Sequence, residues 1–184
     1  MNNTSRKLLL SFYSLLFIFQ FGLGPAQAEQ FSSSGATDVY FSPNGGATKA
    51  IVSELNNAKS EILIQAYSFT SVPIAKAIVD AEKRGVRIEV VLDKSQKTEK
   101  YSSADFVAHA GIPVYIDSSH KIAHNKIMIV DKSVLITGSF NFSKAAEESN
   151  AENLLILKGN KPLVDRYIDN FELHKRHSVV YFGR

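Results

Sequence analysis

The feature that most constrains the fold is an alternation between short apolar runs rich in β-branched residues and segments with helical spacing. The run from Glu61 to Phe69 is apolar at its centre, as expected of a buried strand. The next segment, Val72 to Arg84, places apolar residues on one side of a helix, and Gly85 ends it. Another apolar run, Val86 to Leu92, then follows. A strand, a helix and a second strand in this order are typical of α/β sheets.

The same alternation continues along the chain and predicts a single domain over residues 29–184. Strands are expected at 38–41, 61–69, 86–92, 113–116 and 152–157, helices at 47–58, 72–84, 102–110, 143–148 and 162–174, and a hairpin around residue 131. A helix between two neighbouring strands makes them run parallel, whereas a hairpin makes its two strands antiparallel. We therefore expect an α/β fold with a mixed central β-sheet and helices on both faces.

The most specific motif in the chain is the stretch HNKIMIVDKSVLITGSFN, which occurs once. It can be written H-x-K-x4-D-x6-G-S-x-N, and its fixed residues are His124, Lys126, Asp131, Gly138, Ser139 and Asn141. The apolar runs IMIV and VLIT flank the residues Asp131-Lys132-Ser133, which indicates a hairpin with a tight turn. Residues two apart on a strand share a face, so His124 and Lys126 are expected to point into one site. Ser139 and Asn141 follow the second strand and can approach the head of the first.

The side chains of this motif suit phosphoryl transfer without a metal. Neutral imidazole can attack phosphorus, and the reference pKa of histidine, about 6.5, makes that form available near neutrality. Lys126 is a cation suited to phosphate oxygens, and Ser139 and Asn141 can donate hydrogen bonds to a pentacovalent phosphorus. The motif holds no cluster of carboxylates for magnesium. We therefore predict attack by His124, a covalent phosphohistidine intermediate, no metal and no cofactor.

Two acidic residues complete the set of catalytic candidates. Glu152, just before the apolar run LLIL, is the candidate acceptor that orients the imidazole of His124 through its other ring nitrogen. Asp131 is included because it belongs to the motif, although its position favours fixing the turn and nearby polar groups over bond making. A single histidine near a strand end is usually a surface or core residue. The joint spacing of these residues is what indicates a site.

The motif resembles the signature of the phospholipase D superfamily, also called the HKD family. Gly138, Ser139 and Asn141 match its downstream part, and Glu152 matches the position of the family's histidine-orienting acid. The chain as a whole is similar to the small, secreted, single-motif bacterial endonucleases of that superfamily (the Nuc type). The resemblance implies the fold of one phospholipase D-like half, a histidine nucleophile, a second histidine as general acid, and no metal.

One copy of the motif has a consequence for assembly. Cleavage by this route needs one histidine to attack and another acid to protonate the leaving oxygen. Larger members of the superfamily carry two motifs in one chain, whereas this chain carries one. We therefore expect a homodimer in which His124 of each chain meets at an active site on the two-fold interface.

The other histidines are weaker candidates for the general acid. His109 lies in a helix-like run, and His174 and His177 lie near the C-terminus. His120 comes four residues before His124 and could line the site. A helical metal pair formed by His120 and His124 is not expected, because His124 opens a strand.

Residues 1–28 have the pattern of a secretory signal peptide. Arg6-Lys7 supplies the positive start, residues 8–23 form an apolar core, and Ala26-Gln27-Ala28 is a small-residue cleavage site. We expect cleavage after Ala28 and a periplasmic or secreted bacterial protein without stable membrane association; a retained membrane anchor is the alternative. The sequence has no cysteine, which excludes disulfides and thiol chemistry.

Local lysines say more about the substrate than net charge does. The chain has 21 Lys+Arg and 18 Asp+Glu, and two of the basic residues would leave with the signal peptide, so the mature chain would be nearly neutral. The lysines that gather around the motif are Lys94, Lys97, Lys100, Lys121 and Lys126. If their loops rim the site, they would follow a phosphate backbone. A solvated lysine-rich loop is the other interpretation.

The sequence thus favours a secreted, metal-independent endonuclease that cleaves DNA with little sequence preference, with RNA as a second candidate substrate. The first alternative is a phospholipase D-type lipid phosphodiesterase with the same mechanism. The absence of tryptophan and of an aromatic amphipathic helix argues against it. The second alternative is a catalytically silent nucleic-acid-binding module, and the intact motif argues against that.

Overall fold

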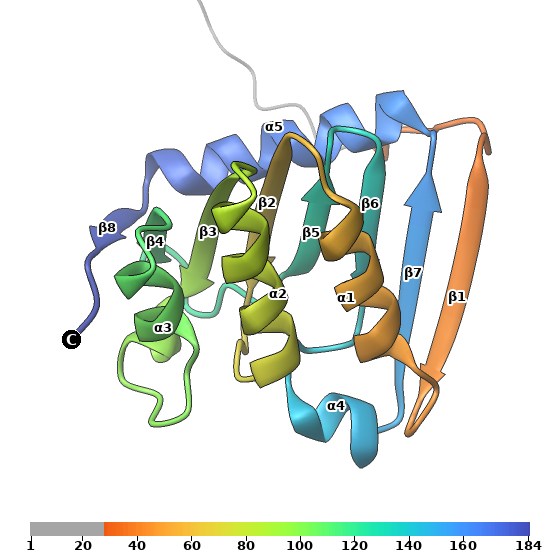
Figure 1. Ribbon diagram of the computed structural model, residues 1–184. Helices are drawn as coiled ribbons and strands as arrows, with labels where there is room; N and C mark the ends of the chain where they lie inside the picture. Colours follow the sequence, from red (N-terminus) through yellow and green to blue (C-terminus); the bar gives the residue numbers. More distant parts are fainter. Residues whose placement is uncertain (1–27) are drawn as a thin grey trace, which may run out of the picture. The chain divides into compact units, whose positions relative to one another are not determined.

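Within residues 28–184, which are those the structure describes, an eight-stranded mixed β-sheet forms the centre of the fold (Figure 1). The structure is a computed structural model. Its strands are β1 (Ala36–Ser42), β2 (Glu61–Ala66), β3 (Arg87–Asp93), β4 (Val114–Asp117), β5 (Lys126–Val130), β6 (Val134–Gly138), β7 (Glu152–Lys158) and β8 (Val179–Tyr181). They lie side by side in the order β1-β7-β6-β5-β2-β3-β4-β8.

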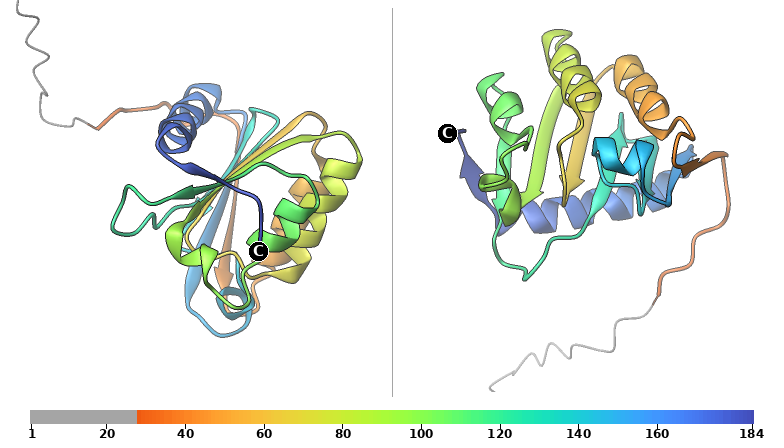
Figure 2. Two further views of the ribbon diagram at one scale, coloured as in Figure 1. Left: turned by 90° about the vertical axis from the view of Figure 1, so that its left-hand side faces the viewer. Right: turned by 90° about the horizontal axis from the view of Figure 1, so that it is seen from below.

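Helices cover both faces of this sheet (Figure 2). On one face lie α1 (Ala47–Asn57), α2 (Val72–Lys83) and α3 (Ala104–His109), and α5 (Lys161–Arg176) crosses the other face. The short helix α4 (Lys144–Glu148) and the 3-10 turn η1 (Lys94–Lys97) lie in connections. The predicted α/β fold, with a mixed sheet and helices on both faces, is confirmed.

The sheet has an apolar core on each side, because its central strands are covered twice. Ile64 and Met128 belong to the core under α1 and α2, whereas Leu63 and Ile129 pack with Phe171 of α5. Successive residues of a strand point to opposite faces, so a strand covered on both sides must be apolar throughout. This explains why β2 reads as a continuous apolar run and does not alternate.

Strand directions place the two ends of the motif, but not its hairpin turn, at the same end of the strands. β2 pairs parallel with β3, and β5 pairs antiparallel with both β2 and β6. The predicted hairpin turn holds Asp131 and Lys132 at φ 50° and 53°, the left-handed pair that matches the twist of a tight hairpin. As a result, the ends of β2, β3 and β6 meet the beginnings of β5 and β7.

At both edges of the sheet, the structure shows strand pairings that the sequence does not predict. β8 pairs antiparallel with β4, although sequence analysis leaves Val179–Tyr181 without an assignment. At the opposite edge, β1 pairs antiparallel with β7 and sets Ala36 opposite Lys158. A strand as short as β8 carries too few residues for a recognisable period, so its pairing depends on tertiary contacts.

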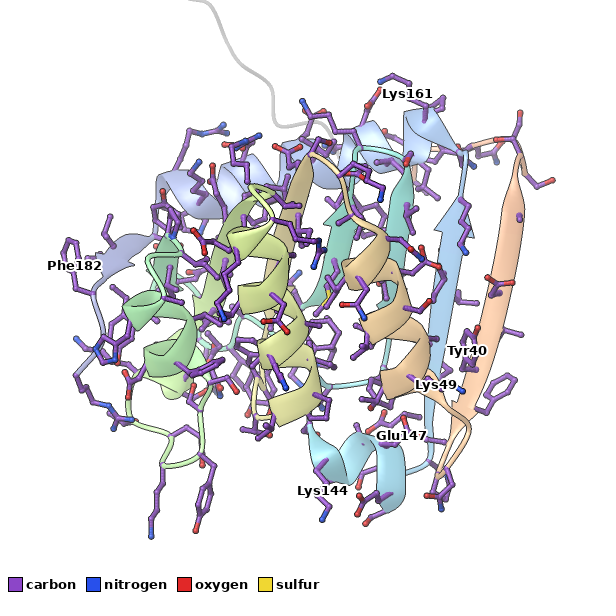
Figure 3. The ribbon with its side chains drawn as sticks, in the orientation of Figure 1. Tyr40, Lys49, Lys144, Glu147, Lys161 and Phe182 are labelled. Atoms are coloured by element: carbon purple, nitrogen blue, oxygen red, sulfur yellow. The ribbon has the colours of Figure 1, made fainter. Side chains whose placement is uncertain are left out.

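A carboxylate from α4 holds the start of α1 (Figure 3). The residue before α1 is Gly46, which has no side chain with which to cap the helix. Glu147 supplies the cap, accepting hydrogen bonds from the backbone N–H groups of Gly46 at 2.9 Å and Thr48 at 2.7 Å. A negative charge is favourable at a helix N-terminus. This contact fixes α4, and with it the loop that carries Ser139 and Asn141.

The predicted signal peptide lies, apart from Ala28, outside the described residues. Its cleavage after Ala28 and the resulting domain over residues 29–184 therefore stay predictions. Among the helices of residues 28–184, none has both the length and the apolar character needed to cross a bilayer.

Candidate active site

The motif residues come together where β5 and β7 begin and β6 ends. Lys126 is the first residue of β5 and pairs with the last residue of β2, while Gly138 ends β6. Ser139, just beyond Gly138, contacts Glu152 at the start of β7. This is also the edge at which the parallel strands β2 and β3 end, the usual place for ligands in open α/β sheets.

Lys126 is a buried cation beside an exposed imidazole. Only 6% of the surface of Lys126 is accessible, whereas His124 is exposed. The Lys126 ammonium donates a hydrogen bond of 2.7 Å to the backbone carbonyl of His124. Burial lowers the pKa of Lys126 to about 8, and the negative charges of Glu152 and Asp93 oppose that shift. The lysine is therefore mostly charged at neutral pH, and its ammonium lies beside the backbone of His124.

Two residues outside the motif position His124. The ring of Tyr67 lies 4.5 Å from the imidazole of His124, between centroids, and the Lys126 ammonium lies 5.0 Å from the same tyrosine ring. The buried carboxylate of Asp93 accepts a 2.7 Å hydrogen bond from the backbone N–H of Ala123. Tyr67 thus provides a wall behind the histidine, and Asp93 holds the chain immediately before it.

Ser139 and Glu152 form a hydrogen-bonded pair across the ends of β6 and β7. The Ser139 hydroxyl donates to Glu152 Oε2 over 2.6 Å and accepts from the backbone N–H of Asn153 over 3.1 Å. Gly138 permits this approach, because a Cβ atom there would lie 2.3 Å from the carbonyl oxygen of Asn153. Two features therefore favour glycine at position 138: the lack of space for a Cβ atom and the positive φ of 150°.

Asn141 lies in the loop beyond Ser139, and its side-chain oxygen is buried without a hydrogen-bond partner within the part of the chain that the structure describes. Buried polar atoms in proteins are nearly always paired, because an unpaired one loses its hydration without compensation. The unpaired oxygen is an acceptor, so it leaves Asn141 able to receive a hydrogen bond from a ligand.

Glu152 and the imidazole of His124 do not form the predicted hydrogen bond within residues 28–184. The Glu152 carboxylate accepts instead from Ser139 and from the side-chain amide of Asn150, at 3.1 Å for the latter. Its charge acts on Lys126, whose pKa it raises against the effect of burial.

Asp131 lies apart from this group, at the opposite end of β5 from Lys126. Its carboxylate accepts hydrogen bonds from the backbone N–H groups of Lys59, Ser60 and Glu61, at 2.8 to 3.0 Å, and from the Ser60 hydroxyl. These contacts favour a positioning role over a catalytic one for Asp131, and its place among the catalytic residues stays a prediction. Asp131 fixes the hairpin turn to the start of β2, the role that its position in the turn favours.

The remaining histidines are also engaged elsewhere. His120 does not line the site, because its Nδ1 atom lies 2.9 Å from Asp117 Oδ2 and its ring contacts those of His174 and His177. His109 is an exposed residue at the end of α3. In the described part of the chain, His124 is thus separated from any second histidine that could serve as its general acid.

A cleft of about 460 Å³ opens beside His124 and Lys126. Helix α5 contributes Arg166, Tyr167 and Asn170 to its lining. On the neighbouring strand end, η1 carries the exposed Lys94, whose ammonium donates to the carbonyl of His120 over 3.1 Å. Basic and polar groups therefore flank the motif from two elements.

Comparison with known proteins identifies the family. The family described as "Cardiolipin synthase, PLD-like domain" matches residues 51–175. The chain belongs to the phospholipase D superfamily. As a member it is a phosphodiesterase. One relative is a protein named phospholipase D from Rickettsia typhi, which is 36% identical over 93% of this chain and 85% of its own length. A human mitochondrial cardiolipin hydrolase is 33% identical over 71% of this chain and 52% of its own length.

Solved structures agree with this assignment. Nuc from Salmonella typhimurium, a phospholipase D family member, shares 36% identity with the present phosphodiesterase at a TM-score of 0.78. The match covers 80% of this chain and 99% of Nuc. NucT from Helicobacter pylori has the same fold at 22% identity, with a TM-score of 0.74 over 80% of this chain and all of NucT.

Several residues around this candidate site are absent from the sequence-based candidates. Tyr67 and Asp93 follow directly on the apolar runs of β2 and β3, and polar residues at the ends of parallel strands are a usable signal for a site. Arg166, Tyr167 and Asn170 carry no such signal. They belong to α5. The sequence predicts this helix, but it does not predict that the helix lies over β5 and β6.

Proposed function

We propose that this phosphodiesterase is a secreted endonuclease that hydrolyses DNA, and RNA as a second substrate, with little sequence preference. The observation that carries the proposal is the pairing of an exposed histidine, His124, with the buried cation Lys126 on a sheet edge flanked by exposed lysines. A cation next to the nucleophile suits a phosphodiester oxygen, and lysines around it suit a polyanion. The similarity to Nuc over nearly the whole of that chain supports a nuclease over other phosphodiesterases.

In the proposed reaction, a lone pair of the His124 imidazole attacks phosphorus, and the bond from phosphorus to the leaving oxygen breaks. A general acid delivers a proton to that oxygen. Lys126, Asn141 and Ser139 stabilise the charge on the non-bridging oxygens of the pentacovalent state. Water then attacks the phosphohistidine and gives its proton to the general acid, which is thereby restored, while the phosphorus–nitrogen bond breaks and frees the imidazole of His124. Each step uses side chains of this protein, and none is assigned to a metal.

Glu152 has two functions in this scheme. Its charge favours the protonated form of Lys126, and it is the candidate acceptor for the second ring nitrogen of His124. Because the imidazole is exposed and the carboxylate bonds to Ser139, that second function requires the ring to rotate toward Glu152 when substrate binds. The hydrogen bond would select the tautomer whose free nitrogen faces phosphorus.

A homodimer supplies the missing acid. In the described residues three of the other histidines gather at Asp117 and His109 lies on α3, so His124 of a second chain is the candidate proton donor. The exposure of His124 allows such an approach. With one imidazole neutral and the other protonated, the rate should follow a bell-shaped dependence on pH.

A lipid phosphodiesterase with the same mechanism is the second candidate. The observation that favours it is the naming of its relatives as phospholipase D or cardiolipin hydrolase. The side chains that α5 and η1 place around the motif are mostly polar or basic, which argues against an apolar surface for lipid. The two candidates differ in substrate and share every proposed bond change.

The first experiment incubates the purified protein with supercoiled plasmid DNA in excess EDTA, beside the variants His124→Ala and His109→Ala. His109 is an exposed histidine outside the site and serves as the matched control. We expect cleavage by the wild type and His109→Ala, and none by His124→Ala. Loss of an otherwise robust activity in EDTA, while the Tm of the protein stays unchanged, would contradict the phosphohistidine mechanism.

Parallel assays separate the substrate from the chemistry. Bis(4-nitrophenyl) phosphate reports phosphodiesterase activity of any kind, single-stranded DNA and RNA test the nuclease, and phosphatidylcholine and cardiolipin vesicles test the lipid hydrolase. Turnover of vesicles together with intact DNA and RNA would replace the nuclease proposal by the lipid one.

Mixing wild-type and His124→Ala protein tests the shared site. If both histidines of a dimer are needed, an equal mixture that has exchanged subunits retains about a quarter of the wild-type activity, since only dimers of two wild-type chains are active. Subunits that act independently would retain about half. Sedimentation analysis of the same mixture establishes whether a dimer is present.

A further inference from the structure

Three histidines converge on a buried carboxylate at the end of β4. The members of this group, called here the Asp117 cluster, are Asp117, His120, His174 and His177. From Asp117 Oδ2, the distances are 2.9 Å to His120 Nδ1, 2.8 Å to His174 Nδ1 and 3.2 Å to His177 Nε2. The four candidate ligand atoms all lie within 4.8 Å of one another. The proposed phosphodiesterase reaction uses none of them.

Hydrogen bonding alone does not account for this arrangement. One carboxylate oxygen has two lone pairs, so it cannot accept three well-formed hydrogen bonds at once. The other oxygen, Oδ1, already accepts from the backbone N–H of Ser119 at 3.0 Å. Protonation of all three rings would place three positive charges around a single negative one. A cation at the centre would instead take a lone pair from each of the four groups.

The donor set and its spacing suit zinc. Three imidazole nitrogens and one carboxylate oxygen are ligands that Zn²⁺ prefers, and four protein ligands are typical of its closed, structural sites. Bonds of about 2.0 Å in a tetrahedron place neighbouring ligand atoms about 3.3 Å apart. The distances from Asp117 Oδ2 to the three nitrogens are already near this value. Rotation of the histidine rings would close the wider nitrogen–nitrogen separations.

The Asp117 cluster is buried on one side and open on the other. The Asp117 side chain is fully buried, and the His174 side chain is 13% exposed, whereas that of His120 is 46% exposed. The Ser119 hydroxyl donates to the carbonyl of His177, which links the loop after β4 to the end of α5. An ion could therefore enter from the His120 side into a site whose other ligands are held by the fold.

We propose that the Asp117 cluster binds one Zn²⁺ as a structural ion that ties the last turn of α5 to the loop between β4 and β5. His174 and His177 are three residues apart and share a face of the helix end, while the other two ligands come from the β4 side. The same loop continues into His124 and begins β5. The ion would thus also steady the chain that leads into the active site, without contacting the reacting groups.

The test begins with the purified protein, stripped of metal by dialysis against a chelator and titrated with Zn²⁺ in a calorimeter. We expect one Zn²⁺ per chain with a Kd below about 1 μM, and a Tm higher by at least about 5 °C in saturating Zn²⁺. Co²⁺ in place of Zn²⁺ should show the visible absorption bands of a tetrahedral complex.

Variants locate the ion. His120→Gln changes a half-exposed side chain and should fold, yet weaken Zn²⁺ at least about tenfold. The double variant His174→Gln/His177→Gln should lose binding, and His109→Gln, outside the cluster, should bind as the wild type does. No binding at micromolar Zn²⁺, or equal binding by His120→Gln and the wild type, would overturn the proposal. These readouts do not depend on catalysis, so they stand or fall separately from the proposed nuclease.

Discussion

Ser139 and Glu152 are joined by a hydrogen bond of 2.6 Å that runs from the serine hydroxyl to the carboxylate. The same hydroxyl accepts from the backbone N–H of Asn153. Its proton therefore points at Glu152, and it becomes available to a phosphate oxygen only if the carboxylate takes another partner. Substrate binding and the rotation of His124 toward Glu152 would thus be linked through one serine.

Ser139→Ala removes this link. We expect kcat/KM to fall about 10- to 100-fold, because the carboxylate loses its positioning donor and the phosphate loses a hydrogen bond. The backbone N–H of Asn153 also loses its acceptor. Ser133→Ala, at the exposed hairpin turn, is the matched control and should leave kcat/KM unchanged. Equal rates for Ser139→Ala and the wild type would remove Ser139 from the site.

Glu152→Gln keeps the shape of the side chain and removes its charge. The pKa of Lys126 is about 8, because burial lowers it by more than Glu152 and Asp93 raise it, and without the charge of Glu152 it should fall further. Because the charged lysine is needed for phosphate binding, the alkaline limb of the profile of kcat/KM against pH should move to lower pH. Glu99→Gln, an exposed residue beyond η1, is the control. A profile that loses height without moving would contradict the electrostatic role.

Lys126→Met should abolish activity and yet stabilise the fold. Burial costs the charged form more than the hydrogen bond to His124 returns, so we expect a gain of about 1–2 kcal/mol in the free energy of unfolding at pH 7. The folded pKa of about 8 lies below the ordinary 10.5, so the unfolded chain binds more protons between these values. The advantage of the variant should be full below pH 8 and fade as pH rises toward 10.5.

Denaturant unfolding of Lys126→Met at pH 7 and at pH 10 measures this difference. Lys121→Met, at an exposed lysine of the loop before His124, controls for the general effect of removing a positive charge. A loss of stability in Lys126→Met at pH 7 would show that the contacts of the ammonium outweigh its burial.

Asp131→Ala should affect stability and leave catalysis intact. Four hydrogen bonds to the carboxylate are lost, so we expect unfolding to become easier by about 1–3 kcal/mol, with kcat within about twofold of the wild type. Burial raises the pKa of Asp131, but the N–H groups of Ser60 and Lys59 lower it by more, to below its ordinary 3.8. The contribution of the wild-type carboxylate is therefore present above pH 4 and lost as pH falls through the folded pKa.

Chemical denaturation and steady-state kinetics on the same preparation separate the two effects. Asp169→Ala, at an exposed aspartate of α5, is the matched control and should change neither. A large fall in the kcat of Asp131→Ala at a temperature where the variant is folded would return Asp131 to the catalytic group.

The sequence predicts the layers of the fold because burial leaves a direct trace in it. Strands covered on both sides read as continuous apolar runs, and helices such as α2 show their buried face by spacing. The pairing of β1 with β7, and of β8 with β4, leaves no such trace, since partners far apart along the chain find each other only in the folded sheet.

The candidate site divides in the same way. The sequence predicts that four residues lie together, because a hairpin brings the start of its first strand beside the end of its second: His124, Lys126, Ser139 and Glu152. Asp131 belongs to the same motif, yet the length of β5 carries it to the other end of the sheet. The gathering of His120 with His174 could not be predicted either, because the path of α5 across the sheet decides which loop its last turn meets.

The pairing of β1 with β7 bears on the order in which the chain acquires its structure. Among the described residues, the strand Ala36–Ser42 has as its sheet neighbour a strand far along the chain, Glu152–Lys158. Contacts so distant in sequence form slowly, since a long loop must close before they can form. A nascent chain would thus keep β1 without this partner until β7 has been synthesised, a delay compatible with the export that the predicted signal peptide implies.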